Sequence, residues 1–470
     1  MSLSAINSAR EKVRQYLDEL TASGLICRDG QFFPSVHYPP ITLYPPVTEE
    51  SLFKGYTNPQ DNLFVIYAHI PFCIMQCDFC HYPVKTRAGN EEKDRYLKML
   101  EREFDLYLRR LGLGKVPARS ILVGGGTPTL MTPAQLQRFL SFLTVRTDMS
   151  HCAQFSFDVE PSTLIDKDGP QRMKIMRDFG VDRLTIGVQS LDDNILKGMN
   201  RPHNAEGALK SIASAQKAGF KINIEFIFGY QGQTLEAWIK TVEQAVTLGV
   251  EEIQLYRLKI IPYGDHQAPI TSKFAQGQEG FHSIEETMLM KEIAIRILNQ
   301  NGYYENLSRV YTKDKNDYSR YANDQCCRLS DQIGIGLTAF SSLRDRFALN
   351  AQNFKEYYEL IDEGKLPINR GLMRDRDAQL RWALILPLKN RNVFKEYFRK
   401  ITGFSVDDVF RKKIDRLKEF DLLYEDDKKL ELTAKGKFFA DEVCQQFHLP
   451  DHMPFPETAY AQGPLNPYND

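Results

Sequence analysis

The stretch "YAHIPFCIMQCDFCHYP", residues 67–83, holds three of the chain's eight cysteines. Cys73, Cys77 and Cys80 are spaced C-x3-C-x2-C, and no fourth cysteine lies nearby. Three thiolates on a loop that follows a strand can hold three irons of a [4Fe–4S] cluster and leave the fourth iron open to another ligand. The alternative is a zinc site completed by His69 or His81, but zinc sites usually take their ligands as two separated pairs. The spacing therefore favours the iron–sulfur cluster.

The chain on both sides of this stretch alternates between short apolar runs and helical patterns. Runs rich in Val, Ile and Phe predict strands at Leu63–Ile70, Ser120–Gly125, Gln154–Glu160, Arg183–Gln189, Lys221–Phe228 and Glu252–Ile260. Apolar residues spaced three and four apart predict helices such as Glu91–Leu111, Pro133–Thr144, Asn204–Ala218 and Leu235–Leu248. This β-α alternation indicates a parallel sheet, either an open doubly wound sheet or a full or partial barrel.

The core predicted at residues 61–265 is flanked by segments of different character. Residues 1–60 combine a helix with a proline-rich stretch. Residues 266–374 are expected to extend the barrel and to cap its substrate side, with a helix at Ser283–Asn301 and a glycine-bearing strand at 332–343. Residues 375–447 have a winged-helix-like pattern, for which a packing or lid role is favoured over nucleic-acid binding. The proline-rich tail, residues 448–470, is expected to be flexible and without a core.

Composition places the protein among ordinary globular chains. Hydrophobic residues make up 42% and charged residues 26%, and 60 basic side chains face 61 acidic ones. No net charge draws the molecule to nucleic acid or to a membrane surface. We find no apolar h-region of a signal peptide and no run of about 18 apolar residues. The other cysteines are scattered, so we expect a reduced, cytoplasmic protein. From the charge balance and the lack of a long apolar run, we expect it to bind neither membrane nor nucleic acid.

A second motif, "LVGGGTPTLM" at residues 122–131, narrows the interpretation. Its three glycines end the second predicted strand and let the polar end of a ligand approach bare backbone. It is neither G-x-G-x-x-G nor a phosphate loop, which argues against nucleoside triphosphate binding. Together with the cysteine triplet, it resembles the radical S-adenosylmethionine (SAM) superfamily. More narrowly, it is similar to the oxygen-independent coproporphyrinogen III oxidase-like branch.

This resemblance covers residues 60–345, with a weaker echo in the C-terminal unit, and implies a partial (β/α)6 TIM-like barrel. It also implies that the open iron of the cluster binds SAM, which is cleaved by one-electron reduction to a 5′-deoxyadenosyl radical. The metal ligands would be Cys73, Cys77 and Cys80. Tyr67 would lie near the SAM sulfonium, and Phe79 would pack on the adenine.

Other positions carry over in the same way. Gly125 would meet the first SAM, beside Phe340. The side of a second SAM, which this branch can bind, would include Gly126, Thr127, Gln189, Arg201 and Lys259. His69 shares a strand face with Tyr67, because alternate residues of a strand point the same way. It is a candidate for orienting the cluster loop or for proton transfer.

Two carboxylates depart from the family pattern. Asp158 in "FDVEP" stands where the family has a longer glutamate, and Glu225 in "NIEFIFGYQGQT" stands where the family usually has aspartate. Because both lie in SAM-contacting motifs, we expect altered chemistry, most concretely a methyltransferase that uses two SAM molecules on an organic substrate.

Two alternatives stay open beside methyl transfer. One is an oxidoreductase, either coproporphyrinogen III oxidase itself or another tetrapyrrole- or haem-related enzyme. The other is a haem-binding, chaperone-like protein, for which His266 and the Cys326–Cys327 pair are candidate axial ligands. Either enzyme would need a small-molecule substrate and a reducing partner such as flavodoxin or ferredoxin.

Overall fold

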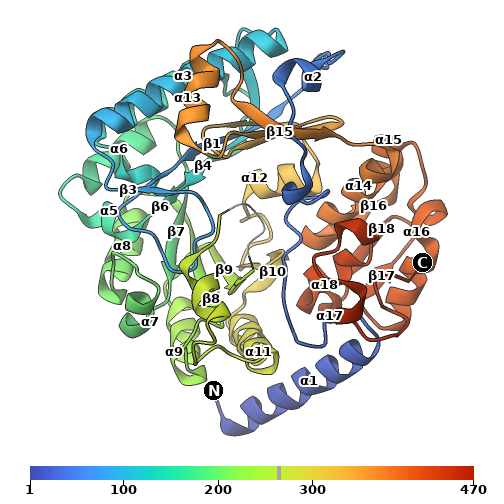
Figure 1. The fold of residues 1–470 in the computed structure, drawn as a ribbon. Helices are drawn as coiled ribbons and strands as arrows, with labels where there is room; N and C mark the ends of the chain where they lie inside the picture. The colour runs from blue at the N-terminus through green and yellow to red at the C-terminus, as the bar shows by residue number, and fades with distance from the viewer. Residues whose placement is uncertain (262–265, 470) are drawn as a thin grey trace.

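The computed structural model describes residues 1–261 and 266–469. Its main sheet contains a run of parallel neighbours, each followed by helical segments (Figure 1). In spatial order these strands are β1 (Phe64–Ile70), β4 (Val116–Gly125), β6 (Phe155–Val159), β7 (Arg183–Gln189), β8 (Lys221–Phe228) and β9 (Glu252–Arg257). The six predicted strands and the partial (β/α)6 barrel are therefore confirmed. Two strand ends differ from the prediction by more than one residue: β4 begins at Val116 rather than Ser120, and β9 ends at Arg257 rather than Ile260.

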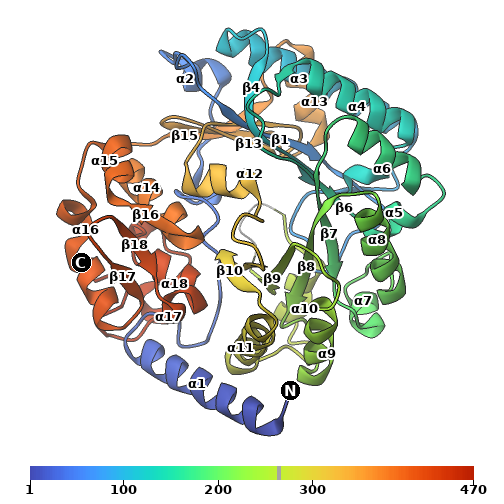
Figure 2. The same cartoon turned by 180° about the vertical axis from the view of Figure 1, so that it is seen from behind.

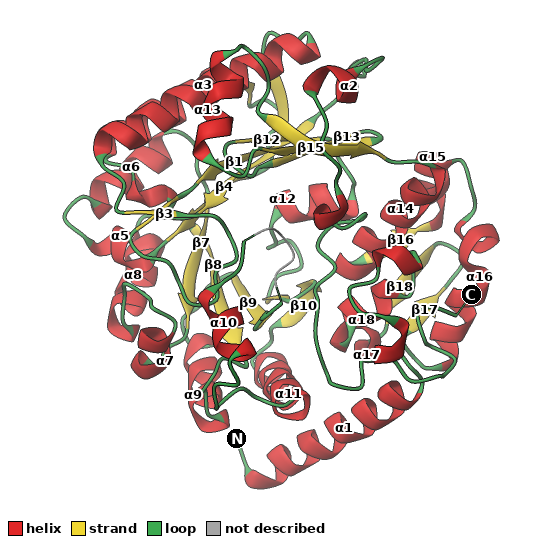
Figure 3. Cartoon of the chain, in the orientation of Figure 1, coloured by secondary structure: helices red, strands yellow, loops and turns green. Residues whose placement is uncertain are grey.

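The helices between these strands cover the outer side of the curved sheet (Figure 3). They are α3 (Asn90–Leu111), α4 (Pro133–Val145), α5 (Pro161–Ile165), α6 (Gly169–Asp178), α7 (Asp193–Gly198), α8 (Ala205–Lys217) and α9 (Leu235–Ala245). Local sequence sets their ends. Thr132 and Gln135 form a capping box before α4, and Gly112 ends α3 in the left-handed conformation.

Fully buried side chains pack between sheet and helices, and they include Ile66, Ile121, Ile224 and Trp238. Burying one such side chain contributes about 1.5–3 kcal/mol relative to leaving it exposed. Successive side chains of a strand point to opposite faces of the sheet. The residues next to these buried ones in each strand therefore point to the inner side of the barrel, where polar side chains gather.

The sheet continues past both edges of the parallel run. On one side β12 (Gln332–Ile335) lies parallel to β1, followed by antiparallel β13 (Phe340–Leu343), β14 (Arg346–Asn350) and β15 (Ile368–Met373). On the other side lie β11 (Val310–Thr312) and β10 (Tyr304–Leu307). The prediction of one strand at 332–343 was wrong, because the chain turns at Gly336 with φ of +106° and pairs β12 with β13.

Helices of the middle segment complete this region: α10 (Pro269–Ala275), α11 (Ile284–Gln300), α12 (Arg320–Ala322) and α13 (Phe354–Asp362). The expected helix at 283–301 is thus confirmed as α11, which Ser283 and Glu286 cap as a box. The predicted end of the barrel core at residue 265 lies outside the described residues. The other predicted domain boundaries stay predictions.

The C-terminal unit is winged-helix-like, as predicted. It comprises α14 (Arg376–Asn390), β16 (Asn392–Phe394), α15 (Lys395–Thr402), α16 (Val406–Glu419), β17 (Leu423–Glu425), β18 (Lys429–Leu432), α17 (Ala434–Phe438) and α18 (Ala440–Gln445). Its strands form a separate sheet in the order β16-β18-β17. In the described chain, no helix is long and apolar enough to cross a membrane.

The segment after the N-terminal helix and the C-terminal tail pack together beside this unit. Helix α1 (Leu3–Ala22) runs along α11, with Lys12 paired to Glu292 at 2.9 Å (Figure 2). After α1, the proline-rich stretch passes the C-terminal unit to α2 (Glu49–Phe53).

The expectation of a tail without a core was wrong. Tyr460 and Leu465 are buried, and the Leu465 N–H donates to the Ser23 carbonyl at 2.8 Å.

Candidate functional site

The cysteine loop leaves the end of β1, where the short strands β2 (Phe72–Cys73) and β3 (Lys85–Thr86) pair and close it. Cys73, Cys77 and Cys80 are free, half-buried thiols. Among the described residues, no three metal-ligating side chains converge on a single ion. In a [4Fe–4S] cluster each thiolate binds a different iron, so the three cysteines would not share one ion.

His81 does not complete a zinc site here, because both of its ring nitrogens are engaged. One contacts the Lys259 carbonyl at 3.2 Å, and the other accepts from the Ala268 N–H at 3.2 Å. Burial raises the pKa of the Cys73 thiol to about 12 and that of Cys80 to about 11. Binding to iron would therefore release protons from these thiols.

Asp78, inside the loop, fixes its conformation. Its buried carboxylate pairs with Lys273 at 2.6 Å and accepts from the Tyr230 hydroxyl at 2.8 Å. Its backbone N–H donates to the Met199 carbonyl, and the Asn200 side chain donates to the Gln76 carbonyl at 2.7 Å. The loop is thus held on a preformed frame, as a cluster-binding loop requires.

The glycine turn after β4 lies directly against this loop. A Cβ atom at Gly126 would come within 2.8 Å of the Cys73 sulfur, and one at Gly125 within 2.7 Å of the His69 ring. Gly125 also has φ of +110°. The Thr127 hydroxyl donates to the Cys73 sulfur at 3.7 Å. The structure thus brings the two sequence motifs together, and side chains larger than glycine are excluded there.

Tyr67 and His69 form a pair on the inner face of β1. The Tyr67 hydroxyl lies 3.0 Å from His69 Nδ1. His69 Nε2 is buried and has no hydrogen-bond partner in the described chain, and burial lowers the pKa of the ring to about 4. Gln189, at the end of β7 with φ of +66°, likewise has a buried Oε1 without a partner. Such unsatisfied atoms fit a site that a polar ligand completes.

The two altered carboxylates lie on neighbouring parts of the inner face. Burial and the nearby charge of Glu225 raise the pKa of Asp158 to about 7. Burial also raises the pKa of Glu225, which accepts from the Tyr256 hydroxyl at 3.2 Å. A Cβ atom at Gly124 would come within 2.4 Å of an Asp158 oxygen. Asp158 therefore adjoins the glycine turn.

Arg201 contacts the cysteine loop itself. Its Nη1 donates to the Cys77 sulfur at 3.1 Å, and its Nη2 forms an ion pair with Glu160. The other Glu160 oxygen lies 2.6 Å from His203 Nδ1. We did not single out Glu160 or His203 from the sequence. Glu160 stands in the quoted "FDVEP", directly before a proline and after a strand, and this position is the signal that could have identified it.

Three predicted residues remain: Lys259, Phe79 and Phe340. Burial lowers the pKa of Lys259 to about 7. Phe79 packs on an apolar cluster around Met199 and Tyr230. The Phe340 ring stacks edge-on against His37 of the proline-rich stretch, with centroids 4.3 Å apart. The roles expected for these three residues toward SAM stay predictions.

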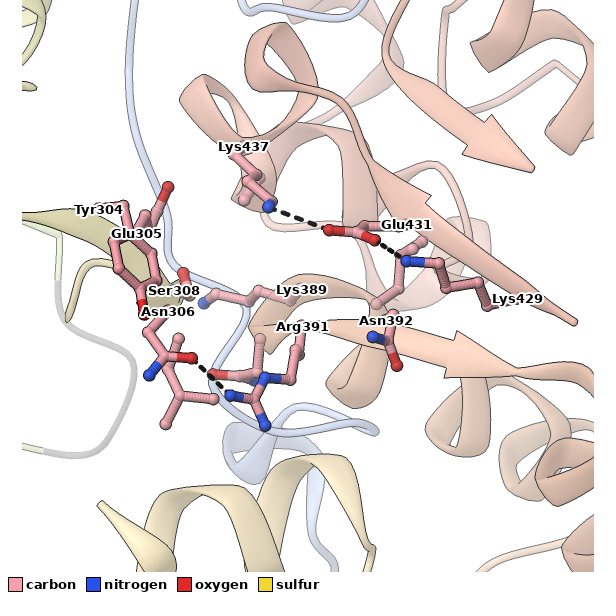
Figure 4. A pocket seen from close by; sticks show the side chains of 14 residues that line it. Tyr304, Glu305, Asn306, Ser308, Lys389, Arg391, Asn392, Lys429, Glu431 and Lys437 are labelled. Carbon is pink, nitrogen blue, oxygen red and sulfur yellow. Dashed lines mark hydrogen bonds and ion pairs between the residues drawn. The ribbon is translucent and has the colours of Figure 1, made fainter. Parts of the chain in front are cut away.

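A separate cavity of about 240 Å³ lies between β10 and the C-terminal unit (Figure 4). Its lysines are balanced by acids: Lys429 and Lys437 both pair with Glu431, and Lys389 pairs with Asp441. Arg391 donates to the side-chain oxygen of Asn306. None of the predicted site residues lines this cavity.

Comparisons with known proteins agree with this geometry. Residues 67–245 match the family model described as the radical SAM superfamily. The heme chaperone HemW of Bacillus subtilis is 26% identical over 388 residues, covering 81% of this chain and 98% of that protein. The oxygen-independent coproporphyrinogen III oxidase of Helicobacter pylori is 26% identical over 430 residues, covering 85% of this chain and 90% of that protein. The solved coproporphyrinogen III oxidase of Escherichia coli has the same fold, with a TM-score of 0.75, 22% identity, and coverage of 87% and 96%.

Proposed function

Because this chain belongs to the radical SAM superfamily, in its oxygen-independent coproporphyrinogen III oxidase-like branch, we propose that it oxidatively decarboxylates propionate side chains of a tetrapyrrole. The observation that carries the proposal is the extent of the similarity. The match to the Helicobacter pylori oxidase spans 430 residues, well beyond the superfamily core at 67–245. The similarity therefore includes segments that flank the radical-generating barrel.

The superfamily's cofactors are a [4Fe–4S] cluster and SAM, and the three free thiols and the glycine turn fit them. When bound, these cofactors supply a 5′-deoxyadenosyl radical that abstracts a hydrogen atom. In the proposed reaction, a propionate side chain loses that hydrogen atom, carbon dioxide and one electron, and a vinyl group is left. The electron would pass to a one-electron acceptor, and a reductant of the flavodoxin or ferredoxin class would supply the electron that SAM cleavage consumes.

The chain's own residues would bind and orient the reactants. Cys73, Cys77 and Cys80 would hold the cluster, and the bare backbone of Gly125 and Gly126 would admit SAM. Tyr67 and His69 would face the reacting end, where the unpartnered His69 Nε2 can accept or donate one hydrogen bond. Asp158 and Glu225 would accept hydrogen bonds from hydroxyl or amino groups of SAM.

Two-SAM methyl transfer, which the carboxylate substitutions led us to expect, is not supported. The curated relatives that cover most of this chain are named as oxidases and as heme chaperones. The second candidate function is haem binding without decarboxylation. It is favoured by the Bacillus subtilis chaperone, 98% of whose length aligns with this chain.

Anaerobic turnover separates the two candidates. The reconstituted protein would be incubated with SAM, a low-potential reductant, an electron acceptor and coproporphyrinogen III labelled in its propionate carboxyl groups. Release of labelled carbon dioxide with a vinyl-bearing product supports the oxidase. Tight stoichiometric haem binding, seen as a Soret band and without labelled carbon dioxide, would instead support the carrier and contradict the proposal.

A further inference from the structure

We propose that Glu160 and His203 are positioning residues that hold the Arg201 guanidinium against the Cys77 sulfur, and that this contact sets the reduction potential of the cluster. This inference goes beyond the proposed reaction. It concerns the electron-accepting centre alone and does not depend on which substrate the radical attacks.

The first step is the orientation of Arg201. Nη1 donates to the Cys77 sulfur at 3.1 Å, while Nη2 donates to the Gly187 carbonyl at 2.8 Å and pairs with Glu160. The two terminal nitrogens thus have different partners on opposite sides. A planar guanidinium held at both ends cannot rotate without losing one of these contacts. Its side chain is only 10% exposed, so water does not readily replace the partners.

The second step is the orientation of Glu160. One of its oxygens pairs with Arg201, and the other lies 2.6 Å from His203 Nδ1. His203 Nε2 in turn lies 3.1 Å from the Val188 carbonyl, an obligate acceptor. The His203 side chain is 1% exposed and that of Glu160 is 6% exposed. The carboxylate is therefore fixed between a cation and a ring that is itself anchored to β7.

These residues come from three different parts of the barrel. Glu160 follows β6 and caps α5. Gly187 and Val188 belong to β7, and Arg201 and His203 lie between α7 and α8. The same α7–α8 connection also holds the cysteine loop by its backbone, through the Met199 carbonyl and the Asn200 side chain. The hydrogen bonds of these residues therefore hold one N–H group of Arg201 against the sulfur of Cys77.

The third step is electrostatic. Reduction adds one negative charge to a cluster that already carries thiolates. A nearby cation and an N–H group directed at a ligand sulfur both stabilise the reduced form. The effect is large in a buried site, because the surrounding medium screens charges weakly. Arg201 held at Cys77 should thus raise the potential, and loosening Arg201 should lower it.

A purely structural ion pair is the competing explanation, and the barrel contains a matched example. Arg183 and Glu252 form a bidentate pair at 2.6 and 2.8 Å, with side chains 3% and 2% exposed. This pair links β7 and β9, and within the described chain its side-chain hydrogen bonds do not reach the cysteine loop. Glu252→Gln therefore breaks a buried ion pair of the same kind and serves as the control.

The test is a double-mutant cycle on the reconstituted cluster, read by redox titration with electron paramagnetic resonance. We expect Arg201→Gln to shift the midpoint potential to more negative values. We expect Glu160→Asp, which keeps the negative charge and shortens the reach to Arg201, to shift it the same way by less. In the Arg201→Gln background, Glu160→Asp should cause no further shift, because the carboxylate keeps its charge and acts only through Arg201. Glu252→Gln should lower the melting temperature and leave the potential unchanged.

The proposal would be overturned by an unchanged potential in Arg201→Gln with full iron content, or by shifts of Glu160→Asp and Arg201→Gln that add. If Glu160→Asp loses its iron, His203→Gln repeats the cycle one hydrogen bond further out. Loss of iron in both variants, with iron retained in Glu252→Gln, would also overturn it, because the network would then hold the loop rather than set the potential.

Discussion

At the scale of residues, the site is marked by buried polar atoms that the described chain leaves unsatisfied. His69 Nε2, Gln189 Oε1 and Arg201 Nε are buried without a hydrogen-bond partner. Each such atom costs about 1–3 kcal/mol of stability when nothing pairs with it. All three belong to residues that the sequence motifs had indicated. Their position on or beside the inner face of the barrel is consistent with a polar ligand such as SAM.

Asp158 gives this site a pH dependence that can be measured. Its pKa is raised from 3.8 to about 7 by burial and by Glu225. The folded state therefore binds this proton more tightly than the unfolded state does. The resulting stabilisation is fully present below the unfolded pKa and is lost as the pH rises through about 7.

We expect Asp158→Asn to remove this dependence, since asparagine does not titrate. Thermal unfolding between about pH 5 and pH 8 should show a smaller loss of melting temperature in the variant than in the parent. Asp18→Asn, at an exposed position on α1, serves as a control. Equal pH slopes in the parent and in Asp158→Asn would contradict the assignment.

The local motifs of the site could be predicted because they are short. Cys73 to Cys80 and Gly124 to Thr127 are runs of a few residues whose chemistry is visible in the sequence. The contact between Glu160 and His203 could not be predicted in this way, because it joins residues 43 positions apart. It forms only because β6 and β7 are neighbours in the sheet.

At the scale of elements, the β-α alternation predicted the parallel run well, since each strand is a short apolar stretch bounded by turn residues. It failed at residues 332–343, where β12 turns into β13. A Cβ atom at Gly336 would come within 2.6 Å of the His69 carbonyl and of the Tyr96 hydroxyl. The need for glycine there is set by distant residues, and no local pattern reveals it.

The Arg183–Glu252 ion pair connects two strands that are not neighbours, because it joins β7 to β9 across β8. We expect Glu252→Gln to lower the free energy of unfolding by about 3–5 kcal/mol, because it leaves a buried guanidinium without its counter-charge. Chemical denaturation would measure this loss. Glu206→Gln, which breaks an exposed pair on α8, should change the free energy of unfolding far less, because solvent already screens that pair. Similar losses in the two variants would contradict this account.

At the scale of the whole molecule, the C-terminal unit and both chain ends form a second apolar core beside the barrel. Composition suggested that the tail is loose, since it contains many prolines. The structure instead buries Leu465 and Asn466, and Gly463 lies against the backbone of Ser23. A few buried side chains outweighed the average composition of the segment.

We therefore expect Leu465→Ala to cost about 2–5 kcal/mol in the free energy of unfolding. Thr458→Ala, at an exposed position in the same tail, should have little effect. Equilibrium unfolding of both variants would measure the difference. A Leu465→Ala variant as stable as the parent would show that the tail is not part of the core.

The central claim is that three thiolates hold a cluster that cleaves SAM. The most direct measurement is the iron and sulfide content of the anaerobically reconstituted protein, alongside a variant with Cys73, Cys77 and Cys80 all changed to alanine. We predict about four irons per chain in the parent, with formation of 5′-deoxyadenosine under reducing conditions, and loss of both in the variant. Four irons retained by the variant, or one zinc per chain in place of iron in the parent, would contradict the claim.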